Sequence, residues 1–309
     1  MTGPAGRIAD QAAPLRQMAS STWSGPDPVP GPGPSSWRLA RTLTVTSGKG
    51  GVGKTVLAVN LALALGELGL RVALVDADLG MANVDVVLGL MPRYHIGHVI
   101  RGVCSLEQAL CPGPKGVLVL PGASGLADLA ALDEARLWQV LRELRQLDRL
   151  ADVVVVDTGA GIGPQVMAFL EASPEVLVVA TPEPTSITNA YGLIKTLVQS
   201  RSTGRDVAPR LFLAVNMDRR RDEGQRVVRR LQTVVGRFLG VEIVTLGIVP
   251  YDGAVALAVA EQTPLLLRRP DSPASRAIRQ LAWRLMDLPE QPQRPGLSGI
   301  VSRMLRRMR

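Results

Sequence analysis

The sequence predicts an α/β fold with a doubly wound, mostly parallel sheet and helices on both faces. We expect a single domain that carries an N-terminal tail and a C-terminal amphipathic helix. First, short Val-rich apolar runs alternate with longer helical stretches, which is the pattern of βαβ units. Second, most of these runs are continuously apolar, as parallel strands covered on both faces should be. Third, aromatic residues make up only 3% of the chain, so Leu, Val, Ala and Ile must build the core.

The composition narrows the class of protein. A net charge of +8 favours anionic partners but does not choose among nucleic acid, lipid and nucleotide. The two cysteines, Cys104 and Cys111, form no disulfide framework, which indicates a reducing compartment. The N-terminus lacks the apolar core of a signal peptide, and the most apolar stretch, 56–74, is interrupted by polar residues. We therefore expect a cytoplasmic protein.

Three segments follow one another along the chain. Residues 1–37 are predicted to be a disordered tail, because 24–36 is a Pro/Gly-rich linker that cannot bury a core. Residues 38–289 form the predicted domain, and 290–309 form a Pro-rich hinge and a terminal helix. Helices are expected at 55–68, 133–147 and 186–200, and strands at 42–46, 71–76, 116–121, 152–158, 175–181, 210–217 and 241–250.

A glycine-rich loop follows the first predicted strand and opens a helix. Its pattern is Gly48-x4-Gly53-Lys54-Thr55, in which backbone N–H groups close around phosphate oxygens at a helix N-terminus. Lys54 would reach the β- and γ-phosphates, and Thr55 would hold Mg²⁺. The predicted ATP contacts in this loop are Gly48, Lys49, Gly50, Gly51, Val52, Gly53, Lys54, Thr55 and Val56.

Lys49 is a second lysine in this loop, although the chain has only four lysines against thirty-one arginines. The backbone already wraps the chain's own phosphates, so Lys49 can point outward at a nucleotide held by a second subunit. The K-G-G-V-G-K-T stretch resembles the deviant Walker motif of the MinD/ParA family of dimerising P-loop ATPases. This resemblance implies that Lys49 contacts the partner's ATP, so that Lys49 and Lys54 both serve catalysis.

Carboxylates end two of the predicted strands. Asp76 and Asp78 follow the second strand, and Asp157 follows "VVVV" in the form of a Walker B strand. Parallel strands end beside the phosphate loop, where a carboxylate can hold Mg²⁺ or orient the attacking water. We predict that Asp157 takes Mg²⁺ through water and that Gly159 lies near the γ-phosphate. The resemblance implies that Asp78 positions the water and that Asp76 lies near the metal.

Two later strand ends are candidates for base recognition. The family reads adenine with an asparagine and with backbone near a proline, which by resemblance points to Asn216 and, further on, to Pro250 and Asp252. No "NKxD" guanine motif follows Asn216. The expected cofactors are therefore ATP, rather than GTP, and Mg²⁺.

The last residues form a predicted basic amphipathic helix. A short helix of this kind after a hinge is typical of an anionic-membrane anchor, and the alternative is a terminal helix packed on the domain. Membrane binding by one copy of this helix is marginal, because apolar burial contributes about 6–10 kcal/mol and ordering the helix costs about 12 kcal/mol. A dimer presents two copies and therefore gains avidity. Its apolar face carries Leu297, Ile300, Val301, Met304, Leu305 and Met308, and its basic face carries Arg303, Arg306 and Arg307.

Further motifs resemble the FlhG group of this family, also called YlxH or FleN. They are "DADLGMANVDVVLGL", "VVVDTGAGI", "TPEPTSITNAYGLIK" and the tail element "DQAAPLR". The resemblance implies control of flagellar number and placement, flagellar C-ring proteins as further partners, and residence at the inner face of the membrane as an ATP-bound homodimer. It also implies stimulation of the SRP-type GTPase FlhF by Asp10, Gln11, Ala12, Leu15 and Arg16. Pro14 and Asn189 depart from the group's pattern.

Other functions of this family remain open. A MinD-type division-site ATPase shares the loop, the carboxylates and the anchor, but it has no reason for the tail element. A ParA-type DNA-partitioning ATPase would use the arginines at 219–221, 226, 229, 230 and 237, although such a run is usually a solvated helix face. Nucleic acid is therefore not among the expected partners. An iron–sulfur protein would need cluster thiolates, and Cys104 and Cys111 match no metal spacing.

Overall fold

The computed structural model describes residues 39–78, 82–122, 143–200, 209–220, 222–289 and 296–308, with side chains up to residue 303 at the C-terminal end. The chain divides into two units, Met1–Trp37 and Arg38–Arg309. All described residues belong to the second unit. The predicted tail, with Asp10, Gln11, Ala12, Leu15 and Arg16, lies outside the described residues.

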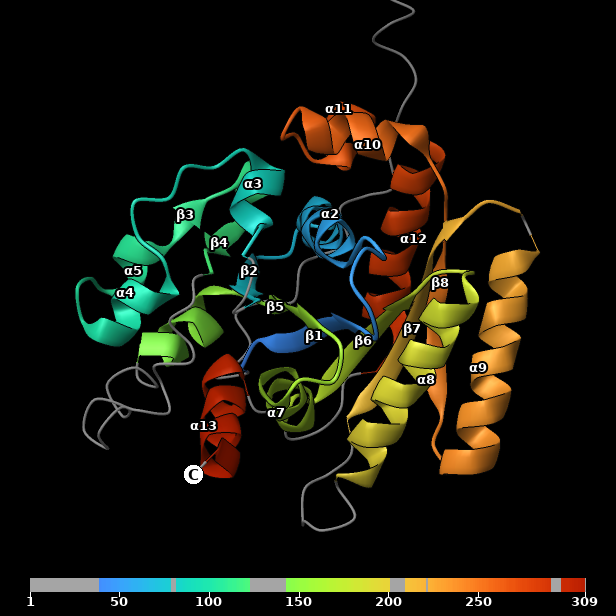
Figure 1. Cartoon of the computed structure of the whole chain (residues 1–309). Coiled ribbons are helices and arrows are strands. Elements are labelled where there is room, and N and C mark those ends of the chain that lie inside the picture. Colours follow the sequence, from blue (N-terminus) through green and yellow to red (C-terminus); the bar gives the residue numbers. More distant parts are fainter. Residues whose placement is uncertain are drawn as a thin grey trace, which may run out of the picture. The chain divides into compact units, whose positions relative to one another are not determined.

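The described residues form an eight-stranded sheet in the order β3-β4-β2-β5-β1-β6-β7-β8 (Figure 1). All neighbouring pairs are parallel except β3 and β4. The seven predicted strands are confirmed, whereas the two-residue β3 was missed because it is too short for any periodicity. The strands are β1 (Arg41–Ser47), β2 (Val72–Ala77), β3 (Cys111–Pro112), β4 (Leu118–Leu120), β5 (Val153–Ala160), β6 (Glu175–Ala180), β7 (Arg210–Asp218) and β8 (Ile243–Pro250).

Helices cover both faces of the sheet, which confirms the predicted doubly wound fold. On β5, Val153 and Val155 join the core under α2 and α12, whereas Val154 and Val156 join the core under α4, α7 and α13. Residues 143–150 are also helical. The helices are α2 (Lys54–Glu67), α3 (Val84–Leu88), α4 (Ile96–Arg101), α5 (Leu106–Ala109), α7 (Pro164–Ala172), α8 (Pro184–Gln199), α9 (Glu223–Leu239), α10 (Gly253–Ala260), α11 (Leu265–Arg268), α12 (Pro273–Asp287) and α13 (Leu297–Met308).

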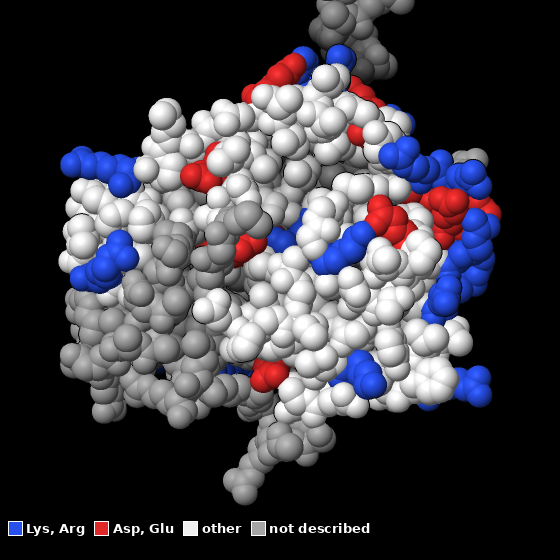
Figure 2. Space-filling model, viewed as in Figure 1, with Lys and Arg blue, Asp and Glu red and all other residues white. Residues whose placement is uncertain are grey.

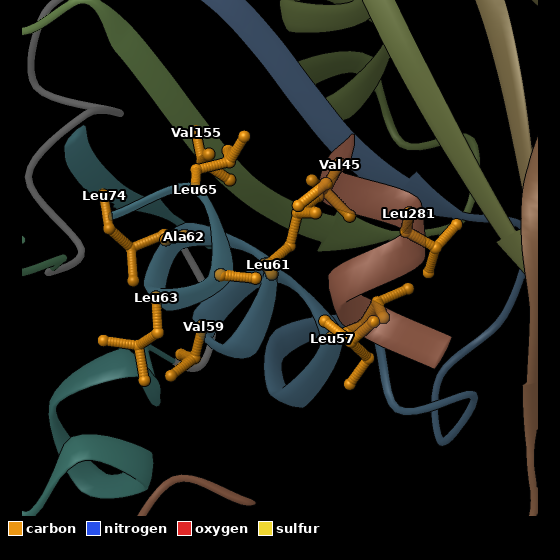
Figure 3. Close-up of a cluster of buried hydrophobic side chains, with 14 of the residues drawn as sticks. Val45, Leu57, Val59, Leu61, Ala62, Leu63, Leu65, Leu74, Val155 and Leu281 are labelled. Atoms are coloured by element: carbon orange, nitrogen blue, oxygen red, sulfur yellow. The ribbon is translucent and has the colours of Figure 1, made fainter. Parts of the chain in front are cut away.

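Most residues of helix α2 are buried. The helix lies on the sheet beside α12, so that Leu57, Leu61 and Leu65 pack in one core with Val155 and Leu281 (Figure 3). A helix that is apolar on all sides is expected to be buried in this way. Because α2 begins at the glycine-rich loop, its packing holds that loop at the C-terminal end of β1.

Asn60 is the polar side chain inside this packing. It is fully buried, yet its amide donates to the Val56 carbonyl at 2.7 Å and accepts from the Leu266 N–H at 2.9 Å. Buried polar groups are tolerated when their hydrogen bonds are made. Asn60 therefore ties α2 to the start of α11 without leaving an unsatisfied group.

The C-terminal helix α13 packs on the domain. Leu297, Ile300 and Val301 are buried in the core that α7 also lines, and α13 lies against α7. In the single chain these three residues of the predicted membrane-facing side therefore lie in the core, as in the alternative of a terminal helix packed on the domain, and their contact with lipid stays a prediction. The periodicity that suits a membrane surface suits a protein core equally well. The side chains of Met304, Leu305, Arg306, Arg307 and Met308 lie outside the described part.

A buried carboxylate caps the first turn of α13. Asp148 accepts hydrogen bonds from the Leu297 N–H at 2.6 Å, the Ser298 N–H at 3.2 Å and the Ser298 hydroxyl at 2.8 Å. Burial raises the pKa of Asp148, and these hydrogen bonds oppose that rise. A Cβ at Gly296 would lie only 2.3 Å from the Asp148 Cγ. The packing of α13 on the domain thus depends on the carboxylate of Asp148 and on the absence of a side chain at Gly296. No helix in the described ranges has the length and apolarity needed to span a membrane.

Candidate functional site

The glycine-rich loop closes the C-terminal end of β1. Gly51 and Gly53 both have a φ of 78°, a left-handed conformation that favours glycine. Gly48 is packed against the backbone of α8, where an added Cβ would lie 2.3 Å from the Asn189 carbonyl carbon. Gly51 and Gly53 are therefore glycine because of their backbone conformation, and Gly48 is glycine because a side chain would collide with α8.

Replacing Gly48 with alanine should displace the loop from α8. The new Cβ would meet backbone atoms, which cannot rotate away, so we expect a destabilisation of about 1–3 kcal/mol and loss of nucleotide binding. Binding of a fluorescent ATP analogue and thermal unfolding would measure both effects. Gly236→Ala on α9 is the matched control, since a Cβ at Gly236 meets nothing within 4 Å and Gly236 does not line the cavity. Equal nucleotide affinity of the two variants would contradict this account.

Lys54 and Asp157 form a buried ion pair beneath the loop. The Lys54 Nζ lies 2.8 Å from the Asp157 Oδ1 and 3.3 Å from the Thr55 hydroxyl. Burial raises the pKa of Asp157, and the ammonium of Lys54 opposes that rise. The other oxygen of Asp157, Oδ2, is buried and makes no hydrogen bond with any described residue. Removing a polar atom from water without a partner is costly, so this oxygen is suited to a ligand.

The donor set here fits Mg²⁺. The unpartnered Asp157 Oδ2 and the Thr55 hydroxyl are oxygen ligands of the kind that Mg²⁺ takes, mostly through retained waters. The prediction of these two residues as metal ligands is compatible with the geometry, and it stays a prediction.

Asp76 does not line the cavity. It is 1% exposed, and its carboxylate accepts N–H hydrogen bonds from Asp78 at 3.0 Å, Asn83 at 2.9 Å and Val84 at 3.1 Å. Burial raises the pKa of Asp76 to about 6. The expectation that Asp76 lies near the metal stays a prediction, and in this structure both of its oxygens accept hydrogen bonds from the backbone N–H groups of Asp78, Asn83 and Val84. Asp76 thus positions the loop after β2, including Asp78.

Asp78 does reach the cavity. It lines the cavity wall, and its Oδ1 lies 3.5 Å from where a Cβ on Gly159 would be. The absence of a side chain at Gly159 therefore lets β5 approach the end of β2. Asp78 and Gly159, which are both predicted to act near the γ-phosphate, therefore lie side by side.

Lys49 turns away from the cavity. Its ammonium pairs with Glu183 and lies 3.3 Å from the Thr185 hydroxyl, and its side chain is 28% exposed. Lys49 is absent from the cavity wall, which contains Gly50, Gly51, Val52, Gly53, Lys54, Thr55 and Val56. Lys49 is thus held at the surface by Glu183 and Thr185, which follow β6.

The cavity at the loop has a volume of about 520 Å³, which falls in the range of small-molecule sites. Residues from four segments form its wall: the loop after β1, the end of β2, the end of β5 and the first turns of α7. Beside the loop, the lining comprises Ser47, Ala77, Asp78, Thr158, Gly159, Ala160, Gln165, Val166 and Phe169.

The three predicted base-reading residues lie at different places in the fold. Asn216 lies against the loop, where its Nδ2 donates to the Val52 carbonyl at 2.8 Å. Pro250 ends β8, and Asp252 caps α10 by accepting from the Ala254 N–H at 2.9 Å. None of these three residues is among those that line the cavity. Their base-reading roles stay predictions.

The arginine run is distributed along one edge of the domain. Figure 2 shows charged side chains gathered where Figure 1 places α9, whereas the face over the central strands is largely uncharged. Arg226 pairs with Asp222, and Arg219 stacks on the Tyr251 ring at 4.0 Å. Arg229, Arg230 and Arg237 are exposed on α9. These contacts are those of a solvated amphipathic helix, as the sequence predicts.

Sequence reasoning missed several residues of the site. Glu183 and Thr185 hold Lys49, and Gln165 and Phe169 close the far wall of the cavity. The acid in "TPEPT" directly after a strand was an available signal for Glu183, because strand ends gather at this edge of the sheet. No local pattern identifies Gln165 or Phe169. Cys104 and Cys111 are free thiols.

The chain is similar to known nucleotide-binding proteins in both sequence and structure. Residues 43–265 match the model of the CobQ/CobB/MinD/ParA nucleotide binding domain. The antiactivator FleN of Pseudomonas aeruginosa is 43% identical over 84% of this chain and 91% of its own. The flagellum site-determining protein YlxH of Helicobacter pylori is 36% identical over 85% and 89%. The structure of MinD from Pyrococcus horikoshii complexed with Mg-ADP superimposes with a TM-score of 0.63 at 25% identity, over 80% of this chain and 96% of that one.

Proposed function

This chain belongs to the FleN/YlxH group of the MinD/ParA family of nucleotide-binding proteins, and we propose that it is an ATPase switch that dimerises on ATP. The observation that carries the proposal is the position of Lys49. It lies outside the chain's own cavity and at the surface, where a compact ammonium is available to a nucleotide in a second copy.

The expected chemistry uses residues already gathered at the cavity. When ATP enters, Lys54 would leave Asp157 for the β- and γ-phosphates, and Asp157 and Thr55 would then be the residues that hold Mg²⁺. Bound Mg²⁺ would neutralise charge on the phosphate oxygens. Asp78 then positions the water that attacks the γ-phosphate, and Gly159 gives the backbone room to approach. The relative crystallised with Mg-ADP supports nucleotide and Mg²⁺ at this site.

Asn216 is our candidate for adenine recognition. Its Nδ2 donates one of its two hydrogens to the Val52 carbonyl, and its Oδ1 is an acceptor for the N6 amino group of adenine. Because the second hydrogen of Nδ2 could meet the O6 of guanine, the comparison of MgATP with MgGTP in solution decides between the two bases.

Size measurement in solution tests this proposal directly. The protein is examined by light scattering with no nucleotide, MgADP, MgATP and MgGTP, and phosphate release is followed in parallel. We expect a dimer and turnover only with MgATP. A monomer under all four conditions, or equal dimerisation with MgGTP, would refute the dimerising ATPase.

Membrane binding is part of the proposed switch. The docked helix α13 contacts α7, and α7 begins shortly after the end of β5, where we predict that Gly159 lies near the γ-phosphate. A shift at the end of β5 on ATP binding would move α7 and loosen α13. We propose that the freed helix then places its apolar and basic faces on anionic lipid, with two copies per dimer supplying avidity.

Undocking α13 by mutation should give membrane binding without ATP. Asp148→Ala removes the cap, worth about 0.5–2 kcal/mol, and Gly296→Ala introduces a Cβ that collides with the Asp148 carboxylate. We expect both variants to sediment with vesicles of anionic phospholipid when nucleotide is absent. Asp152→Ala is the control, because it breaks an exposed pair with Arg71 that does not touch α13. No gain in vesicle binding by either variant would count against sequestration.

The cellular role is proposed from the relatives. FleN is named an antiactivator and YlxH a flagellum site-determining protein, so we propose that this chain regulates flagellar number or placement from the cytoplasm. The tail would act on FlhF. Adding a peptide of residues 1–37 to FlhF should accelerate GTP hydrolysis, whereas a peptide with Gln11→Ala should not. An inactive wild-type peptide would leave no support for the FlhF partnership.

A further inference from the structure

Gln165 lines the cavity, although neither the sequence motifs nor the proposed chemistry uses it. It is the second residue of α7, and it lines the cavity together with residues of the glycine-rich loop. The inference below rests on the proposed ATPase function, because it assigns a role in that same site.

The surroundings of Gln165 include Asp78. A Cβ at Gly159 would lie 3.5 Å from the Asp78 Oδ1 and 3.3 Å from the Val166 Cγ2. The Asp78 carboxylate and the first turn of α7 therefore meet over Gly159. Gln165 directly precedes Val166 and shares this corner of the cavity.

The other neutral and cationic polar side chains of the cavity are already engaged. Ser47 donates to the Lys49 carbonyl, Thr158 donates to the Val45 carbonyl, and Lys54 bonds Asp157 and Thr55. Among the described residues, Gln165 has no hydrogen-bond partner, and its side chain is exposed to the cavity. An amide offers both donors and an acceptor, whereas an ionised carboxylate such as Asp78 only accepts.

We propose that Gln165 orients the attacking water beside Asp78. Its Oε1 accepts a hydrogen bond from the water while its Nε2 donates one to a γ-phosphate oxygen, which is the way glutamine serves other P-loop hydrolases. The water oxygen forms a bond to the γ-phosphorus as the bond to the β–γ bridging oxygen breaks, and ADP leaves with the bonding pair. A water proton passes to Asp78 and then to the released phosphate. Gln165 exchanges no proton.

Gln165→Met tests this role, because methionine keeps the length and helix propensity of glutamine but forms no comparable hydrogen bond. Gln225→Met, on the exposed face of α9, is the matched control. Steady-state turnover, the KM for MgATP and the lifetime of the ATP dimer are measured for both variants and wild type. We expect kcat to fall about 100- to 1,000-fold in Gln165→Met, with KM unchanged and a longer-lived dimer.

The outcomes separate this inference from the function on which it rests. Wild-type protein without MgATP turnover would refute the ATPase itself. Wild-type turnover with an unchanged kcat in Gln165→Met would overturn only the water-orienting role. A raised KM or a lost dimer in Gln165→Met, with an unaffected Gln225→Met, would show that Gln165 serves binding or folding instead, and it would overturn the proposal as well.

Discussion

Lys49→Ala is expected to bind ATP as a monomer and to lose the dimer. Each Lys49 would make a charge-assisted hydrogen bond to the partner's phosphate, worth about 1.5–3 kcal/mol. A symmetric dimer contains two such contacts. Their loss weakens dimerisation about 10²- to 10⁴-fold, while Lys54 and the loop backbone still hold the chain's own nucleotide. Light scattering with MgATP and binding of a fluorescent ATP analogue measure the two quantities separately.

Glu183 supplies the control for this prediction. In the single chain the Lys49 ammonium pairs with Glu183, and the Glu183 side chain is 62% exposed. Exposed pairs contribute only about 0–1 kcal/mol, so the pair holds Lys49 ready without strongly opposing its transfer to a partner. Glu183→Gln should therefore still dimerise with MgATP. Equal dimerisation by wild type and Lys49→Ala would remove Lys49 from the interface and would undermine the proposed function.

The parts of the site that sequence predicts well are those set by local backbone geometry. Gly51 and Gly53 occupy the positive-φ positions that a phosphate loop needs, and Lys54 meets Asp157 because both follow central strands of a parallel sheet. The seven main strands were visible for a related reason. A strand buried on both faces must be continuously apolar, and that pattern survives in the sequence.

The parts that sequence predicts poorly depend on partners far away in the chain. In the sequence Asp76 looks like a metal ligand, because the three backbone N–H groups that donate to its carboxylate are brought to it only by the fold. Ile300 and Val301 suit a lipid surface or a core equally well, and Asp148, about 150 residues away, decides between them in the single chain. Gln165 carries no motif. Its importance follows only from a cavity that four separate segments assemble.

Asp78→Ala should bind MgATP, dimerise and then fail to hydrolyse. Asp78 lies at the cavity wall next to Gly159 but makes no part of the glycine-rich loop, so its loss leaves the phosphate contacts intact. Removing a group that positions or deprotonates the attacking water typically costs about 10²- to 10⁴-fold in rate. Because hydrolysis is what ends the dimer in the proposed switch, dimers should accumulate.

Trapped dimers of Asp78→Ala test whether dimerisation leads to membrane binding. If dimerisation frees α13, Asp78→Ala should remain on anionic vesicles with MgATP long after wild type has dissociated, and Lys49→Ala should not bind them under the same conditions. Asp78→Ala with MgADP is the internal control and should behave like wild type. An Asp78→Ala protein that turns over ATP at the wild-type rate would place the attacking water elsewhere. One that dimerises but never reaches the vesicles would separate dimerisation from membrane binding.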